Sequence, residues 1–127
     1  MSDEETSVSV TAKTAWHAWD GVFVFTLEEE GEPPIVLRLG YGDCEWVVTA
    51  CDFAARKRPF DKVLSLHAVA ESGGRLLFAR VTADAGRVGF SIEAPFGLMG
   101  WSCLFDGAEA EGIKRTARQA MRQADSR

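Results

Sequence analysis

Asparagine is absent from the 127-residue sequence, tyrosine occurs once and histidine twice. Arginine outnumbers lysine ten to four. Coding DNA rich in G and C produces this usage, so we expect a bacterial source. The apolar content of 46% and the charged content of 26% are close to globular averages and exclude a chain that is disordered throughout.

Long hydrophobic runs are also missing, since no apolar stretch approaches the roughly 20 residues that cross a membrane. The N-terminal stretch MSDEETS is acidic and polar, whereas a secretory signal begins with basic residues and continues with an apolar segment. We therefore expect a cytoplasmic protein that does not bind a membrane.

The three cysteines, Cys44, Cys51 and Cys103, are widely spaced and form no C-x-x-C pair. They lack metal-ligand spacing and are typical of reduced, buried thiols. The glycines match neither G-x-G-x-x-G nor the phosphate-binding G-x-x-x-x-G-K-[ST]. The sequence therefore predicts no bound cofactor and no metal.

The net charge of −5 is distributed unevenly along the chain. Residues 1–52 carry eleven acidic and two basic side chains, a net charge of −9. Residues 53–127 carry eight acidic and twelve basic side chains, a net charge of +4. Such halves attract each other within a fold or steer a charged partner. The overall negative charge disfavours nucleic-acid binding, even with the basic run ARKRP and the arginines near the C-terminus.

Alternation of apolar and polar residues predicts strands over most of the chain. The expected strands of the first half span residues 7–13, 22–27, 35–39 and 44–51. The segment AWHAWDG breaks the first pattern, and Asp20-Gly21 is a turn signal. After the fourth strand, Asp52 is expected to cap a short helical turn within 52–61.

Two hairpins are expected in the second half, with turns at 72–74 and 84–86. Residues 62–71 are ambiguous: Leu64, Leu66 and Ala68 alternate as in a strand, but Asp61 and Gly73 would also delimit a helix. We favour the strand, because the glycines at 73 and 74 align it with the next one.

The strongest pattern lies at the C-terminus and predicts a helix over 108–124, about 26 Å long. Asp106 and Glu109 have capping-box spacing. One apolar stripe follows at helical spacing, formed by Ile113, Ala117, Ala120, Met121 and Ala124. Because the stripe consists mostly of alanine, we expect the helix to lie close against a flat partner such as a sheet.

The order of elements predicts an α+β fold that is mostly β. We expect an antiparallel sheet of six to seven strands, curled or partly closed, with one C-terminal α-helix packed on it. Residues 1–6 are expected to be a flexible N-terminus, and residues 7–127 a single sheet-plus-helix domain.

Two patterns resemble catalytic or metal sites only in part. Ser102 in GWSCL begins like a nucleophile elbow, but Leu104 stands where the second glycine is required. His17, Asp20 and His67 would suit a metal only if the fold brings them together. We interpret the serine and the histidines as structural and favour a protein that is not an enzyme.

The uncharged stretch APFGLMGWSCLF at 94–105 has too many large apolar residues for one face of a strand. We expect Leu98, Cys103 and Phe105 in the core, and Phe96, Met99 and Trp101 as a candidate exposed patch. The predicted partner-binding residues are Trp16, Trp19, Glu28, Glu29, Glu30, Phe96, Met99 and Trp101.

The favoured function is a small protein-interaction domain of adaptor, chaperone-like or inhibitor type. It would dock a partner protein, for which a basic surface is favoured, through its acidic half and these apolar anchors. Self-association through the apolar patch is a variant of this hypothesis. The alternative is a small-molecule-binding or enzymatic β-barrel with an apolar pocket under the helix.

Overall fold

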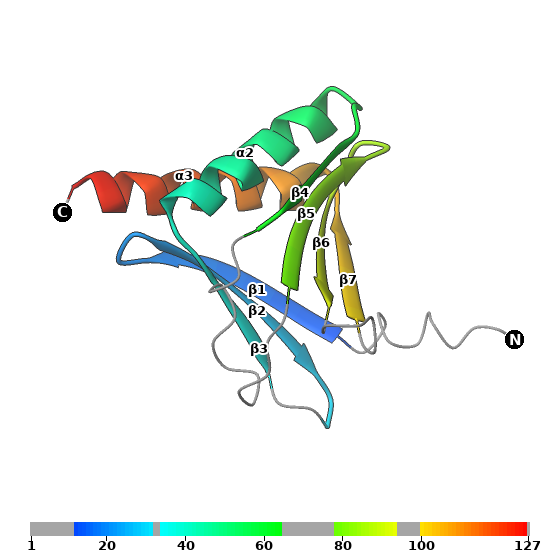
Figure 1. The fold of residues 1–127 in the computed structure, drawn as a ribbon, viewed down its shortest axis with the longest axis horizontal. Helices are drawn as coiled ribbons and strands as arrows, with labels where there is room; N and C mark the ends of the chain where they lie inside the picture. Colours follow the sequence, from blue (N-terminus) through cyan, green and yellow to red (C-terminus); the bar gives the residue numbers. More distant parts are fainter. Residues whose placement is uncertain (1–11, 32–33, 65–77, 94–99, 127) are drawn as a thin grey trace, which may run out of the picture.

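The computed structural model describes residues 12–31, 34–64, 78–93 and 100–126 (Figure 1). They form an α+β fold, mostly of strands, with two antiparallel sheets of order β1-β2-β3 and β4-β5-β6-β7 and with two helices. The elements are β1 Ala12–Trp19, β2 Val22–Glu29, β3 Ile35–Leu39, α2 Tyr41–Ala55, β4 Phe60–Val63, β5 Phe78–Asp84, β6 Arg87–Glu93, β7 Gly100–Phe105 and α3 Gly107–Asp125.

The prediction of one sheet with six to seven strands is wrong, because the seven described strands divide into a sheet of three and a sheet of four. The division falls at α2, which separates β3 from β4 and carries the chain from the first sheet to the second. The antiparallel pairing is confirmed in both sheets. Two described helices, rather than one, pack against the strands.

The strand predicted at 44–51 is wrong, since this segment belongs to α2. Val47, Val48 and Thr49 are β-branched and favour a strand locally. However, the buried residues of α2 recur at helical spacing, namely Cys44, Val47, Ala50, Cys51 and Ala54. Burial of this stripe outweighs the local propensity. The predicted cap at Asp52 is wrong for the same reason, because Asp52 lies within α2.

The break predicted at AWHAWDG is also wrong, because β1 continues to Trp19. Trp16 is paired with Phe25 in the register of β1 and β2, whereas Trp19, three residues further, lies on the opposite face. Because Trp16 and Trp19 put large apolar side chains on both faces of β1, this part of the strand shows no alternation of apolar and polar residues. The turn at Asp20-Gly21 is confirmed; both residues have positive φ, 53° and 83°, as two-residue hairpins require.

The C-terminal helix is confirmed, since α3 runs from Gly107 to Asp125 and buries Ile113, Ala117 and Ala120. Asp106 is the N-cap residue, as its spacing from Glu109 predicts, but the capping box is not formed, because the Asp106 side chain makes no cap hydrogen bond. The Asp106 carbonyl oxygen accepts a hydrogen bond from the Glu109 N–H at 3.0 Å. Helix α3 packs along β1 and β2, and α2 packs against both α3 and the four-stranded sheet (Figure 1). The Lys114 Nζ and Asp52 Oδ1 atoms, 2.6 Å apart, join the two helices.

The second predicted hairpin is confirmed by β5 and β6, which are joined at Ala85-Gly86. The first predicted turn, at 72–74, lies outside the described residues. In the ambiguous segment 62–71, Lys62 and Val63 end strand β4, and 65–71 lies outside the described residues. The division into 1–6 and 7–127 stays a prediction.

The core lies where the two sheets face each other, and its centre is aromatic. The Phe25 ring centroid is 4.8 Å from that of Phe90 and 6.2 Å from that of Phe105. Phe23 stacks on Phe90 at 6.5 Å. Phe23 and Phe25 come from β2, whereas Phe90 and Phe105 come from β6 and β7, so these contacts hold the sheets together.

Candidate protein-binding surface

Trp16, one of the predicted partner-binding residues, is part of the core. Its side chain is half-buried, stacks on Phe25 at 6.5 Å and meets the Phe105 ring edge-on at 5.2 Å. A tryptophan held between two core phenylalanines contributes to packing of the sheets. Packing against these two rings explains why a tryptophan stands at this position, without any contact to a partner protein.

Trp101 and Glu29, two further predicted residues, are brought together and bind each other. The Trp101 Nε1–H donates a hydrogen bond to Glu29 Oε1 at 3.1 Å, and both side chains are half-buried. The bond connects β7 to β2 across 72 residues of chain. Both residues therefore contribute to the contact between the sheets.

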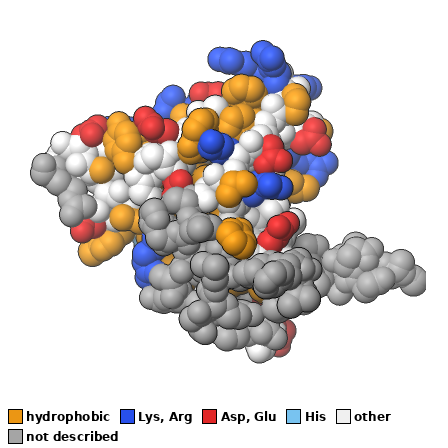
Figure 2. Space-filling model, viewed as in Figure 1, with side chains coloured by type: hydrophobic (Ala, Val, Ile, Leu, Met, Phe, Trp, Pro, Cys, Tyr) orange, Lys and Arg blue, Asp and Glu red, His pale blue; other side chains and the backbone are white. Residues whose placement is uncertain are grey.

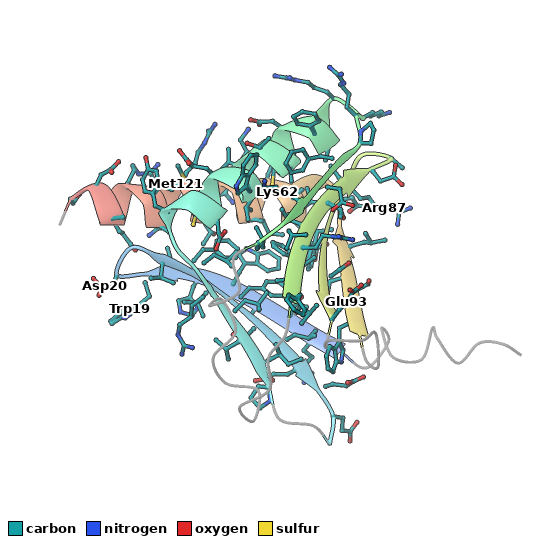
Figure 3. All side chains as sticks on the ribbon, in the orientation of Figure 1. Trp19, Asp20, Lys62, Arg87, Glu93 and Met121 are labelled. Atoms are coloured by element: carbon teal, nitrogen blue, oxygen red, sulfur yellow. The ribbon has the colours of Figure 1, made fainter. Side chains whose placement is uncertain are left out.

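The remaining described candidates do not form one patch. Trp19 is 70% exposed beside the β1–β2 turn, and Figure 3 shows its side chain directed away from the molecule. Glu28 and Glu30 are exposed at the opposite end of β2, about 20 Å away at the rise of an extended strand. Phe96 and Met99 lie outside the described residues.

The residues considered for catalysis and metal binding are described only in part. Ser102 is exposed opposite Ser91 on paired antiparallel strands, with 3.5 Å between the hydroxyl oxygens. His17 is exposed on β1, and His67 lies outside the described residues. Among the described residues, no group of three or more His, Cys, Asp or Glu side chains is placed to hold a metal ion.

Cys44 and Cys51 are buried, as predicted, whereas Cys103, which was also expected in the core, is half-buried and packs against it. Burial raises the pKa of Cys44 and of Cys51 from 9.0 to about 12, and it also raises the pKa of Cys103. The Cys44 and Cys51 thiols donate to the carbonyl oxygens of Leu39 and Ala110, each at 3.6 Å. They remain protonated at neutral pH and are poor nucleophiles.

A surface that the sequence did not indicate lies on α2 and β4. Trp46, Phe53 and Phe60 form an aromatic cluster there, with Phe60 of β4 placed against both residues of α2. The Phe60 ring centroid is 6.0 Å from that of Trp46 and 5.0 Å from that of Phe53. Phe53 and Phe60 are half-buried and pack against the core, whereas Trp46 is 37% exposed, so the cluster extends from the core to the surface.

Two cations lie over this cluster. The Lys62 Nζ is 4.4 Å from the Trp46 ring centroid, and the Arg58 guanidinium carbon is 5.8 Å from that of Phe53. Both distances are within the range of cation–π attraction. Figure 2 shows hydrophobic and basic side chains side by side over α2 and β4, and Figure 3 shows Lys62 between these two elements.

The chain reversal after α2 creates the cluster. The Arg58 N–H bonds to the Phe53 carbonyl at 2.8 Å and the Lys57 N–H to the Ala54 carbonyl at 2.9 Å, which is a Schellman motif. Lys57 occupies the left-handed position of this motif, with φ of 58°. The turn sends β4 back along α2, so that Phe60 meets the helix and three consecutive cations, residues 56–58, are exposed.

The segment that ends this surface, residues 53–64, has a charge opposite to that of the whole chain. It contains four cations and one carboxylate, Asp61. The Asp61 Oδ1 is 3.0 Å from the Arg80 Nε on β5, so this carboxylate has its own partner. The cations therefore lie at the turn and on β4, whereas α2 itself carries Asp43, Glu45 and Asp52.

The i, i+7 spacing of Trp46 and Phe53 is the only sequence signal for this cluster, and it has meaning only on a helix. A strand at 44–51 would put Trp46 on a sheet and Phe53 in the turn after it. Phe60 follows Pro59 and belongs to the same segment, 52–61. No local pattern relates it to α2, because the contact depends on the chain reversal.

The aromatic core lies between the two sheets. A depression of about 610 Å³ lies at one end of the four-stranded sheet and is open to solvent. Pro59, Thr82 and Leu104 are among its lining residues. It adjoins the aromatic cluster through Phe60.

Comparisons of the chain with models of protein families, with curated proteins and with solved structures found no match. Within the described part of the chain, neither helix has the length and apolar content needed to cross a membrane. The expected cytoplasmic location stays a prediction.

Proposed function

We propose that this chain is a non-enzymatic protein-interaction domain that binds an acidic segment of a partner protein at the aromatic cluster on α2 and β4. The observation that carries this proposal is the exposed Trp46 ring, supported by Phe60 and lying under the Lys62 ammonium group at 4.4 Å. Aromatic and cationic side chains in such contact are typical of the residues that dominate binding energy at protein interfaces.

The charge of the surface supports an acidic occupant. The four cations between residues 53 and 64 attract carboxylates, whereas the rest of the chain has an excess of negative charge that repels them. A diffusing acidic segment is thus directed to α2 and β4 before contact. The apolar rings then supply the short-range attraction that charge alone lacks in water.

The sequence-based hypothesis of a basic partner at the acidic half remains a separate proposal. Glu28 and Glu30 are exposed at the end of β2 and suit a cationic surface. The two surfaces carry opposite charge, so a second copy of the chain is one candidate source of the acidic segment. A concentration-dependent oligomer that dissociates with salt would identify that source.

Selection of random dodecapeptides displayed on phage tests the proposal. Immobilised wild-type protein serves as bait, and each selected peptide is then measured against Lys62→Glu, Trp46→Gln and Arg118→Glu. We expect enrichment of acidic and aromatic residues, and an affinity lowered about tenfold or more by Lys62→Glu. Trp46→Gln removes the ring and is expected to weaken the same peptides.

Arg118→Glu is the matched control, because it makes the same charge change at an exposed residue of α3. The selected peptides should bind this variant as they bind the wild type. Circular dichroism of all variants checks the fold. Equal loss with Lys62→Glu and Arg118→Glu, or no enriched peptide at all, would contradict the proposal.

A further inference from the structure

Strand β4 lies at the edge of the four-stranded sheet and offers a second strand a place to pair. Resting on the function proposed above, we propose that the acidic segment binds in extended form and pairs with the outer edge of β4, which adds a strand to the four-stranded sheet. Strand β4 is the first strand in the order β4-β5-β6-β7, and among the described residues no strand lies on its other side. An edge strand presents unpaired amide and carbonyl groups to an incoming chain.

The backbone register identifies the groups that face outward. The Leu64 N–H donates to the Ala79 carbonyl at 2.8 Å, and Lys62 is opposite Val81. Hydrogen-bonded and non-hydrogen-bonded pairs alternate in an antiparallel ladder, so Lys62 and Leu64 point their backbone groups toward β5. The amides and carbonyls of Asp61 and Val63 therefore point away from the sheet.

The side chains of β4 also divide between two faces. Phe60 and Lys62 lie on the side of α2, where they contact Trp46. Asp61 and Val63 are exposed on the other side, next to Arg80. A strand paired with β4 would repeat this alternation, with every second side chain beside Lys62 and the aromatic cluster.

The composition of β4 explains why the edge accepts one class of strand. The strand has four residues, of which Asp61, Lys62 and Val63 are exposed, and Pro59 precedes it. A short edge with a lysine and a proline disfavours indiscriminate pairing. Lys62 favours an incoming strand that carries a carboxylate opposite it, so the segment should alternate acidic or aromatic residues with variable ones.

Backbone methylation of the tightest selected dodecapeptide tests this mode of binding. A series of peptides is made with one N-methyl group each, which removes one N–H donor and leaves the side chains unchanged. We expect methylation at every second residue of the central segment to lower the affinity by about tenfold, and methylation at the residues between to have little effect. Fluorescence anisotropy measures the affinities.

Hydrogen exchange of the protein supplies an independent readout. The amides of Asp61 and Val63 should exchange more slowly when the peptide is bound, whereas that of Lys62, which faces β5, should change less. A peptide that depends on Lys62 and Trp46 but shows no alternation in the methyl series would overturn strand pairing and leave the docking proposal intact. A selection with no Lys62-dependent peptide overturns both.

Discussion

Phe25 illustrates how single residues hold this fold together, because its ring is fully buried between Phe90 and Phe105 at the contact of the two sheets. We predict that Phe25→Ala lowers the free energy of unfolding by about 3–5 kcal/mol, the cost of lost burial and of the cavity left behind. Trp19→Ala, which removes a larger but exposed ring, should change it by less than about 0.5 kcal/mol. Urea denaturation of both variants checks the pair. Equal losses would place Phe25 outside the core.

Lys57 is strained at the end of α2, since its φ of 58° is a left-handed conformation that glycine adopts without cost. We predict that Lys57→Gly raises the free energy of unfolding by about 1 kcal/mol, because the Schellman motif is retained without a Cβ in the unfavourable region. Lys57→Ala keeps the Cβ and should give no such gain. If both variants were stabilised equally, the cause would be the loss of the lysine charge and not the relief of backbone strain.

Cys44 and Cys51 make stability depend on alkaline pH. Their pKa of about 12 in the fold exceeds the ordinary value of 9.0, so their contribution is fully present below pH 9 and is lost as pH rises toward 12. We predict that the free energy of unfolding falls more between about pH 8 and about pH 10.5 in the wild type than in a Cys44→Ala/Cys51→Ala variant. Parallel slopes of the two proteins would contradict this.

At the scale of elements, a hydrogen bond joins the β1–β2 turn to α3 across 102 residues of chain. The Gly21 N–H donates to Gln123 Oε1 at 3.0 Å. We predict that Gln123→Ala accelerates hydrogen exchange at the Gly21 amide about fivefold, the effect of losing about 1 kcal/mol of local stabilisation. Gln119→Ala, at an exposed position of α3, should leave that amide unchanged. A Gly21 amide that exchanges at the same rate in all three proteins would argue against the contact.

The elements with one dominant pattern were predictable from the sequence. Helix α3 has its N-cap residue and its alanine stripe within one segment, and the turn at 84–86 lies between two alternating runs. Helix α2 was not predictable in this way, because the β-branched residues at 47–49 favour a strand and only tertiary burial selects the helix. The single-sheet prediction followed from that error, since a strand at 44–51 leaves no element to separate the sheets.

The candidate site was less predictable than the fold for a related reason. Tryptophans and acidic residues can be read from the sequence, but their exposure cannot. Trp16 packs on Phe105 and Trp101 donates a hydrogen bond to Glu29, both in contacts between the sheets, whereas Trp46 is exposed at the surface. The cluster that Trp46 forms with Phe60 depends on a helix, a left-handed lysine and a reversed chain, none of which leaves a periodic pattern.

At the scale of the whole molecule, the uneven charge of the sequence is kept in the fold. The exposed acidic residues Glu28 and Glu30 lie at the end of β2, whereas the cations at 56–58 directly follow α2 and Lys62 lies on β4. The molecule therefore presents clusters of opposite charge at different elements. Long-range charge directs the encounter of two proteins, and short-range contacts hold the complex. Lys62 lies beside the exposed Trp46 ring, so this surface offers an acidic partner both kinds of attraction.

An NMR titration of the ¹⁵N-labelled protein with the tightest selected dodecapeptide tests the central claim most directly, because it shows where an acidic segment binds. We expect chemical-shift changes at the amides of Asp61, Lys62 and Val63 and at the Trp46 indole N–H, all of them reduced in Lys62→Glu. Changes confined to Trp19, or to Glu28 and Glu30 at the far end of β2, would contradict it.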